Sequence, residues 1–367
     1  MSAPEKPPAM TAEGETLMPP SNTTIAYPCG DDLPAPGQWI EVASGVFWLR
    51  FPLPFALDHI NLYVFDDGDG WTLVDTGVSS AESVALWQGL LRNQLASKPI
   101  NRLLVTHWHP DHIGMAGWLA DQTAAPLWIT RTEWLMARMT RAEETSAFAA
   151  PAIAYFQRLG LSDQKRHDLT RLGDHYGSLT TPIPTEFIRL KAGTDITLGG
   201  SRWQVLIGRG HAPEHACLYS PERNLIIGGD ILLPRISPIV GIWPAEPEED
   251  ALSDFLTSLQ DIRAAVDPAA LVLPSHNRPY TGVHTRIDDL TAHHDERLQT
   301  TRQACRQPVS AAAVTKVLFP RLEDAFQLRL GLAETVAHLN HQRARGHINR
   351  SLDADGIYRY QTVTPEA

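Results

Sequence analysis

The sequence has few cysteines and no long apolar run, and both absences exclude whole classes of protein. Its three cysteines, Cys29, Cys217 and Cys305, are too few and too scattered to form a disulfide framework. No stretch approaches the ~18 consecutive apolar residues of a membrane-spanning helix, and the N-terminus lacks the basic and apolar regions of a secretory signal. We therefore expect a cytoplasmic protein without a membrane partner.

An excess of positive charge is also absent. The formal net charge is −11, which argues against a protein that coats nucleic acid, because phosphate binding needs a basic surface. An apolar content of 43% with 20% charged residues is typical of a soluble globular protein. At roughly 150 residues per domain, the 367 residues predict two domains, or one large domain with an appendage.

The clearest positive feature is a cluster of metal-binding side chains that follows a short apolar run at residues 103–105. The cluster contains four potential ligands: His107, His109, Asp111 and His112. Such side chains at the end of a strand can surround a metal pair, whereas neighbours on one helix face fall three or four positions apart. Loop histidines without a metal are the alternative. The strand-end pattern, with Pro110 fixing one backbone angle inside it, favours a metal site.

Three further metal-competent side chains have the same placement, each just past an apolar strand: His211, Asp230 and His276. Taken alone, each of them is more typical of a structural residue than of a functional one. Four strand-to-loop junctions of this kind in one chain indicate instead that the side chains share one site.

These motifs resemble those of the metallo-β-lactamase superfamily, and in particular its binuclear hydrolases, which include glyoxalase II. The resemblance rests on five segments: Asp75-Thr76-Gly77, the run from His107 to Gly114, Gly210-His211, Gly229-Asp230 and Ser275-His276. It covers roughly residues 38–300. It implies an α/β fold of the αββα type, in which two sheets pack together between outer layers of helices.

Composition and pattern divide the rest of the chain. Residues 1–37 are rich in Pro, Ala, Ser and Thr, so we expect a flexible leader or an arm along the body. Residues 131–186 have helical periodicity and predict an insertion that either roofs the site or covers a sheet edge. Residues 301–367 predict helices followed by a hairpin around Asp353-Ala354-Asp355-Gly356. This last module resembles the winged helix of the β-lactamase-like protein 2 branch.

The resemblance also implies the role of each ligand. His107, His109 and His211 would hold one divalent ion, Asp111, His112 and His276 a second, and Asp230 would bridge the two. Zn²⁺ suits this set of nitrogen and oxygen ligands, and iron and manganese are alternatives because the same ligands serve them. Asp111 would also orient the nucleophile. Asp75 would hold a ligand imidazole through its other nitrogen, or simply cap the turn at Gly77.

Candidates for the substrate pocket are fewer. His59 precedes an early strand and lines either the pocket or the core. Arg278 offers a cation for an acidic substrate, and Trp243 offers an apolar wall. His215 is a potential extra ligand, although a loop or core role is the favoured interpretation.

The function favoured by the sequence is a hydrolase that uses a metal-bridging hydroxide on a small-molecule acyl substrate, namely an ester, thioester or lactone. One alternative is a metal-dependent endoribonuclease or nucleic-acid-binding protein. It draws support from the winged helix, because residues 302–352 contain eight Lys and Arg against three Asp and Glu. A mono-iron dioxygenase is a further alternative. Winged helices also serve as dimerisation elements, which leaves a homodimer open.

Overall fold

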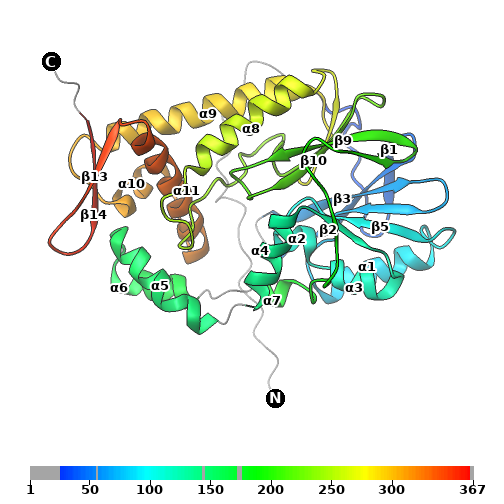
Figure 1. The fold of residues 1–367 in the computed structure, drawn as a ribbon, viewed down its shortest axis with the longest axis horizontal. Coiled ribbons are helices and arrows are strands. Elements are labelled where there is room, and N and C mark those ends of the chain that lie inside the picture. Colours follow the sequence, from blue (N-terminus) through cyan, green and yellow to red (C-terminus); the bar gives the residue numbers. More distant parts are fainter. Residues whose placement is uncertain (1–24, 55–56, 143–144, 172–175, 364–367) are drawn as a thin grey trace.

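Two β-sheets lie face to face, with helices on their outer surfaces (Figure 1). The computed structural model describes residues 25–54, 57–142, 145–171 and 176–363. The first sheet has seven strands in chain order: β1 (Trp39–Ala43), β2 (Val46–Pro52), β3 (His59–Asp66), β4 (Trp71–Val74), β5 (Ile100–Leu104), β6 (Leu127–Ile129) and β7 (Ile188–Arg189). The first four strands are antiparallel, and β4 to β7 run parallel.

The second sheet has five strands in the order β12, β11, β10, β9 and β8. Their bounds are β8 (Asp195–Leu198), β9 (Ser201–Gly208), β10 (His215–Ser220), β11 (Leu225–Gly229) and β12 (Leu271–Pro274). Only the pair β11 and β12 is parallel. The carboxyl ends of strands from both sheets therefore meet at one edge of the sandwich, which is where the candidate site lies.

Apolar side chains from the two inner faces fill the space between the sheets. The fully buried Trp48, Phe65 and Trp203 belong to this core, and the rings of Phe65 and Trp203 meet edge to face at 5.4 Å. Such sheet-on-sheet packing buries the alternate residues of each strand and leaves the other face of each sheet for helices.

Helices complete the outer layers. Helices α1 (Ala81–Arg92) and α3 (Ala116–Thr123) cover the first sheet, where Trp87 and Leu119 are fully buried. Helices α8 (Ala251–Ala265) and α9 (Val283–Ala304) cover the second sheet, and Phe255 is fully buried beneath them. The αββα sandwich predicted from the sequence is thereby confirmed.

Four helices lie between β6 and β7, inside the segment predicted as a helical insertion. They are α4 (Arg131–Ala142), α5 (Thr145–Arg158), α6 (Asp163–Arg171) and α7 (Tyr176–Leu179). Helix α4 packs on the first sheet's side, where Trp134 stacks on Phe187. Helices α5 and α6 lie near the C-terminal helices (Figure 1), and Ala312 donates its backbone N–H to the carbonyl of Leu159. The insertion thus contacts both the side of the first sheet and the C-terminal helices.

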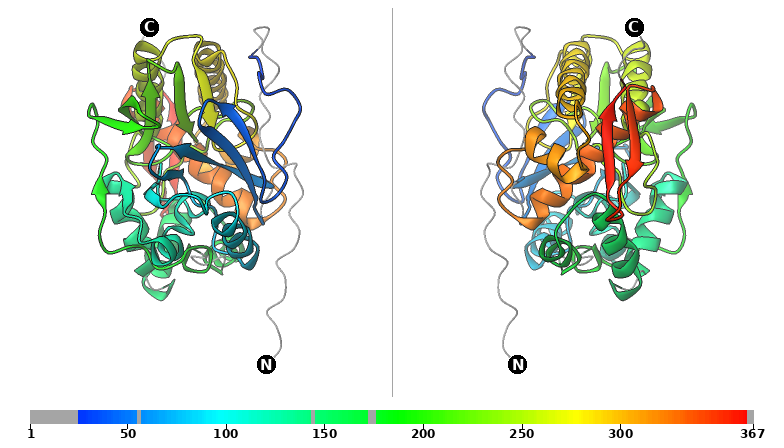
Figure 2. Two further views of the ribbon diagram at one scale, coloured as in Figure 1. Left: turned by 90° about the vertical axis from the view of Figure 1, so that its right-hand side faces the viewer. Right: turned by 90° about the vertical axis from the view of Figure 1, so that its left-hand side faces the viewer.

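The C-terminal module consists of α10 (Ala311–Leu318), α11 (Ala325–Ala344) and a hairpin of β13 (Ile348–Leu352) and β14 (Tyr358–Thr362). The predicted order of two helices and a hairpin is therefore present, and its assignment as a winged helix stays a prediction. Figure 1 shows the hairpin at the end of the molecule remote from the two sheets, and the right-hand view of Figure 2 shows it facing the viewer. Residues 364–367 lie outside the described residues.

Of the arm predicted at residues 1–37, residues 1–24 lie outside the described residues. Residues 25–37 run along the body, where Ala26 pairs with Thr281 in an isolated bridge. Among the described residues, no helix combines the length and apolar character needed to cross a bilayer.

Candidate metal centre

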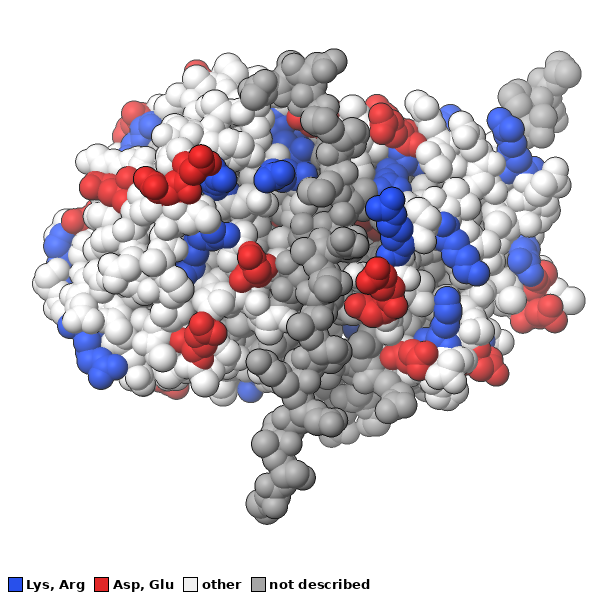
Figure 3. Space-filling model, turned by 180° about the vertical axis from the view of Figure 1, so that it is seen from behind, with Lys and Arg blue, Asp and Glu red and all other residues white. Residues whose placement is uncertain are grey.

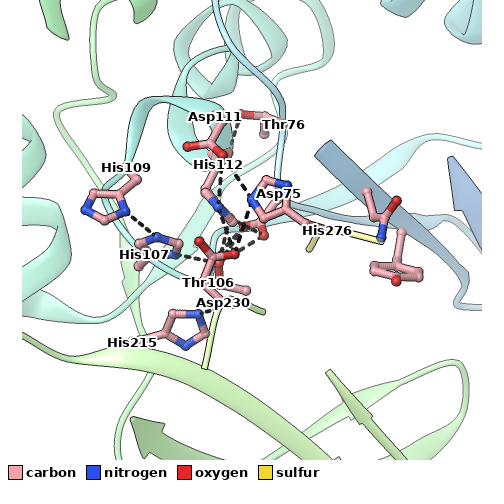
Figure 4. Close-up of polar contacts among 12 residues, drawn as sticks. Asp75, Thr76, Thr106, His107, His109, Asp111, His112, His215, Asp230 and His276 are labelled. Atoms are coloured by element: carbon pink, nitrogen blue, oxygen red, sulfur yellow. Dashed lines mark hydrogen bonds and ion pairs between the residues drawn. The ribbon is translucent and has the colours of Figure 1, made fainter. Parts of the chain in front are cut away.

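Seven potential ligands converge where four strands end. Helix α2 (Pro110–Ile113) follows β5 and carries two of the ligands, while single ligands follow β9, β11 and β12. The ligands form two groups, within each of which the donor atoms lie within 4.8 Å of one another: His107, His109, His211 and Asp230 in the first group, and Asp111, His112 and His276 in the second. Figure 4 labels His107, His109, Asp111, His112, Asp230 and His276, whose side chains lie close together.

The first group contains three imidazoles besides the carboxylate of Asp230. Nε2 of His107 lies 2.9 Å from Nδ1 of His109 and 3.3 Å from Nε2 of His211. The second group joins one carboxylate to two imidazoles. Oδ2 of Asp111 lies 3.4 Å from Nε2 of His112 and 3.5 Å from Nε2 of His276.

Asp230 faces both groups, with one oxygen for each. Its Oδ2 lies 3.3 Å from Nε2 of His211, in the first group. Its Oδ1 lies 3.5 Å from Nε2 of His112 and 3.6 Å from Nε2 of His276, in the second group. The carboxylate therefore has the placement that a bridging ligand needs.

These distances fit a metal ion better than a hydrogen-bond network. Ligands ~2.1 Å from a tetrahedral Zn²⁺ lie about 3.4 Å from one another, which is the spacing in the second group. Nε2 of His112 and Oδ1 of Asp230 are buried polar atoms without a hydrogen-bond partner among the described residues. Since buried polar atoms are normally paired, these two atoms indicate that the site is built to hold a cation.

Asp75, which is itself held by Thr106, orients His112 of the second group from the side of the ring opposite Nε2. Nδ1 of His112 donates to Oδ2 of Asp75 over 2.8 Å, and Oδ1 of Asp75 accepts the backbone N–H of Thr106 over 2.8 Å. Asp75 has a φ of 59°, a left-handed conformation that Asp tolerates better than most residues. The carboxylate thereby fixes the tautomer of His112 and leaves its Nε2 free for a metal.

The other imidazoles are oriented in a similar way. Nδ1 of His276 donates to the carbonyl of His59, and Nδ1 of His211 donates to the carbonyl of Ile239, both over 2.8 Å. His215 is not a member of either ligand group. Its Nε2 accepts the backbone N–H of Asp230 over 3.2 Å, so it supports the loop that carries this carboxylate.

The short helix α2 is locked to the loop after β4. Pro110 occupies its first turn, where a missing N–H costs nothing. The hydroxyl of Thr76 donates to the carbonyl of His112 over 2.7 Å. A Cβ on Gly114 would lie 2.3 Å from the carbonyl oxygen of Pro110 and 2.5 Å from that of Gly77, so only glycine allows this close approach.

Comparison with known proteins identifies the family to which this site belongs. Residues 56–276, which include every member of both ligand groups, match the Metallo-beta-lactamase superfamily. The chain belongs to the metallo-beta-lactamase superfamily. Residues 298–363 match the C-terminal domain described as Metallo-beta-lactamase-like, and they contain the helices and hairpin of the C-terminal module.

Individual relatives agree with this assignment. The protein named "Probable metallo-hydrolase YqjP" of Bacillus subtilis is 28% identical over 324 residues, which cover 85% of this chain and 97% of that protein. A beta-lactamase domain protein from Burkholderia ambifaria is 40% identical, with a TM-score of 0.86 over 92% of this chain and 98% of that one. A linear primary-alkylsulfatase from a Pseudomonas species is 26% identical over 58% of this chain and 40% of that protein. The chain is thus a metallo-hydrolase of the metallo-beta-lactamase superfamily.

Electrostatics in this metallo-beta-lactamase site is dominated by burial and by three carboxylates. Burial lowers the pKa of His109 to about 3 and that of His107 well below its ordinary value. Burial also acts to lower the pKa of His112, but the nearby carboxylates, led by Asp111 and Asp230, outweigh it and raise that pKa well above the ordinary value. The second group is therefore the one in which protons compete most strongly with a cation.

The carboxylate of Asp230 stays charged despite its burial. Burial acts to raise the pKa of Asp230, but the neighbouring His112 and His276 hold it well below the ordinary value. The same two imidazoles hold the pKa of Asp111 below its ordinary value, again against the effect of burial. Both carboxylates are consequently ionised and ready to bind a dication near neutral pH.

The three predicted pocket residues lie outside the ligand groups. Burial lowers the pKa of His59 to about 4, and its neutral Nε2 accepts the backbone N–H of Asn277 over 2.8 Å. Arg278 forms an ion pair with Asp31, in the described part of the N-terminal arm. Trp243 has the guanidinium of Arg329 over its ring at 5.5 Å. A role of these three side chains in substrate binding stays a prediction.

Two residues that touch the ligand loops were missed in the sequence. Asn61 carries a signal, because a polar residue interrupts the apolar run from Ile60 to Phe65, and it is buried against the loop of His276. Glu133 carries no such signal, because acidic residues are common in the first turn of a helix. Only the tertiary structure shows that Glu133 is fully buried.

Proposed function

We propose that the protein is a binuclear metal-dependent hydrolase of ester, thioester or lactone substrates. One observation carries this proposal, namely that the two oxygens of Asp230 face different ligand groups at 3.3 and 3.5 Å. A carboxylate that serves a single ion has no need of a second, separate set of ligands. The donor set of nitrogen and oxygen atoms suits Zn²⁺, which we expect as the resident metal.

When bound, the two ions lower the pKa of a coordinated water and polarise the oxygen that gains negative charge during hydrolysis. The protein residues supply the rest. His107, His109 and His211 would hold the first ion, and Asp111, His112 and His276 the second. Asp230 would keep the two ions together, because its charge offsets the repulsion between two dications.

Asp111 is the residue that we expect to handle the proton. Its Oδ2 faces His112 and His276, while the side chain keeps 16% exposure. The carboxylate can therefore accept the proton of the attacking water and pass it to the leaving oxygen or sulfur once the acyl bond breaks. Asp75 would act indirectly, by holding His112 in the tautomer that binds metal.

Ion pairs within the molecule argue against a nucleic-acid substrate. Arg343 and Arg350 both pair with Glu248, and Arg345 pairs with Asp250, so three of the eight basic side chains of residues 302–352 dock the C-terminal module on the half that contains the two sheets. On the face seen in Figure 3, acidic and basic side chains are interspersed. A track that binds phosphates would instead need basic residues free of internal partners.

A substrate panel tests the proposal. It contains a thioester, a lactone, a carboxylic ester, an alkyl sulfate and an RNA oligonucleotide, with the sulfate included because of the alkylsulfatase relative. We expect turnover of at least one acyl substrate, with activity lost in Asp230→Ala and on chelation. Turnover of RNA alone would replace the proposal by the nuclease. One equivalent of iron with oxygen uptake, and no hydrolysis, would replace it by the dioxygenase.

A further inference from the structure

A buried carboxylate outside the ligand set joins the two loops of the first group. Glu133, in the first turn of α4, is fully buried. Its Oε2 accepts the backbone N–H of Trp108 over 3.0 Å, and its Oε1 accepts the backbone N–H of Glu214 over 2.5 Å. Trp108 lies between His107 and His109, and Glu214 lies three residues after His211. A single side chain therefore sets the spacing of loops that lie about a hundred residues apart in sequence.

Hydrogen bonds between the start of α4 and the loop of Glu214 run in both directions, which makes this contact rigid. Oε2 of Glu214 accepts the backbone N–H of Thr132 over 3.0 Å, and the hydroxyl of Thr130 donates to the carbonyl of Glu214 over 2.8 Å. The start of α4 and the loop after His211 are thus tied in both directions. Charge-assisted bonds of a carboxylate to backbone N–H groups are among the stronger hydrogen bonds in proteins.

The loop of the second group's His276 is held by a different element, strand β3. The carbonyl of His59 accepts Nδ1–H of His276, and the ring of His59 accepts the backbone N–H of Asn277, both over 2.8 Å. Asn277 has a φ of 68°, a left-handed conformation that a non-glycine residue holds only with support from its surroundings. His59 therefore holds both the ligand His276 and the next residue, Asn277, through hydrogen bonds.

Two more polar side chains of β3 share this task. Asn61 donates from Nδ2 to the carbonyls of Pro274 and Asn277, each over 2.8 Å, and the hydroxyl of Tyr63 donates to the carbonyl of Pro274 over 2.8 Å. His59, Asn61 and Tyr63 are two residues apart, so they lie on the same face of the strand. None of them contacts the loops of the first group through a hydrogen bond that the described residues show.

We infer that the metal centre is braced at two separate places by residues that bind no metal, with Glu133 holding the two loops of the first group and His59 with Asn61 holding the loop of His276 in the second. The inference rests on the proposed binuclear function and deepens it. It makes Glu133 and His59 positioning residues, because each acts through the geometry of a ligand loop. It also makes the helical insertion, through α4, a structural part of the first metal site.

The experiment measures zinc binding to the metal-free full chain by isothermal titration calorimetry, with melting temperature as the check on folding. The ligand variants His109→Ala and His276→Ala first show which binding step belongs to which group. Glu133→Ala should then weaken the first group's step by 10- to 100-fold, with the other step changed less than about threefold. His59→Ala should have the opposite selectivity. Glu133→Gln, which keeps one acceptor oxygen, should lie between wild type and Glu133→Ala.

Two matched controls separate bracing from general destabilisation. Glu334→Gln removes another buried carboxylate, on α11, and His284→Ala removes another partly buried imidazole, on α9. Both should leave both steps unchanged. The inference would be overturned if Glu133→Ala and His59→Ala each weakened both zinc-binding steps equally. Unchanged zinc affinities in Glu133→Ala would also overturn it. If wild type binds only one equivalent of zinc, the binuclear proposal is wrong. The inference would then stand only if either Glu133→Ala or His59→Ala, but not both, weakens that single binding step.

Discussion

Replacing Asp75 by Asn tests how the second ligand group is held. The variant keeps the size of the side chain, and Asn tolerates the φ of 59° at this position at least as well as Asp does. The wild-type carboxylate accepts from both His112 and the backbone N–H of Thr106. An amide has only one oxygen, so its NH₂ group must face one of these two donors.

The expected cost follows from that mismatch. Loss of a partner that orients a metal-binding imidazole lowers metal affinity by about 10- to 100-fold, which is about 1.4 to 2.7 kcal/mol. The charge of Asp75 also helps to raise the pKa of His112, after Asp111 and Asp230. Since a proton on His112 competes with the metal, the affinity of wild type should keep rising with pH above the ordinary imidazole range. In Asp75→Asn, the affinity should stop rising at a lower pH.

Competition with a fluorescent zinc chelator between pH 5.5 and 8.5 measures both effects. We expect the gap between wild type and Asp75→Asn to be widest at pH 8.5 and to narrow toward pH 5.5. Asp195→Asn makes the same chemical change at an exposed residue of β8 that pairs with Arg202. The zinc affinity of this control should follow that of wild type at every pH. Parallel curves for wild type and Asp75→Asn, or no loss of affinity at any pH, would refute the assigned role of Asp75.

Three further outcomes concern stability. Burial raises the pKa of Glu334 to about 7, so the folded state keeps a proton that the unfolded chain releases above pH ~4.5. The free energy of unfolding of wild type should therefore fall as pH rises from 4.5 toward 7. In urea titrations, Glu334→Gln should stabilise the protein by roughly 2 to 3 kcal/mol at pH 8 but not at pH 4.5. Equal effects of the substitution at both pH values would contradict this. Glu248→Gln removes the charged partner of Arg343 and Arg350. It should lower the free energy of unfolding by under about 1 kcal/mol, because the Glu248 side chain is 55% exposed. A larger loss of stability in thermal melts would show that these ion pairs contribute more. Trp203→Ala should cost about 3 to 5 kcal/mol by opening a cavity between the sheets, and an unchanged urea midpoint would argue against that packing.

Much of the fold could be predicted from the sequence because its signals are local. The apolar run at residues 103–105 overlaps the end of β5, and the hairpin predicted around Asp353-Ala354-Asp355-Gly356 is formed by β13 and β14. Apolar runs ending in turn residues mark strand ends, and ligands directly after those ends must gather at one edge of a sandwich. Boundaries were less predictable. The segment at residues 131–186, predicted only as helical, is divided into the four helices α4 to α7 among its described residues.

The supporting contacts could not be predicted, because they join residues far apart in the chain. Glu133 reads as an ordinary acid in the first turn of a helix, and only the fold places it between two ligand loops. The basic charge of the C-terminal module favoured phosphate binding as long as its partners were unknown. Glu248 and Asp250 pair with three of its basic side chains, Arg343, Arg345 and Arg350, and composition alone does not encode these contacts.

The binuclear claim is tested most directly by the metal content of the full chain, measured by plasma mass spectrometry on protein purified without added metal. Wild type should contain two equivalents of divalent metal, mainly zinc. Asp230→Ala should contain one equivalent or less, because Asp230 is the only ligand that faces both groups of the described centre. One equivalent in wild type, unchanged in Asp230→Ala, would contradict the assignment of Asp230 as a bridge and with it the proposed mechanism.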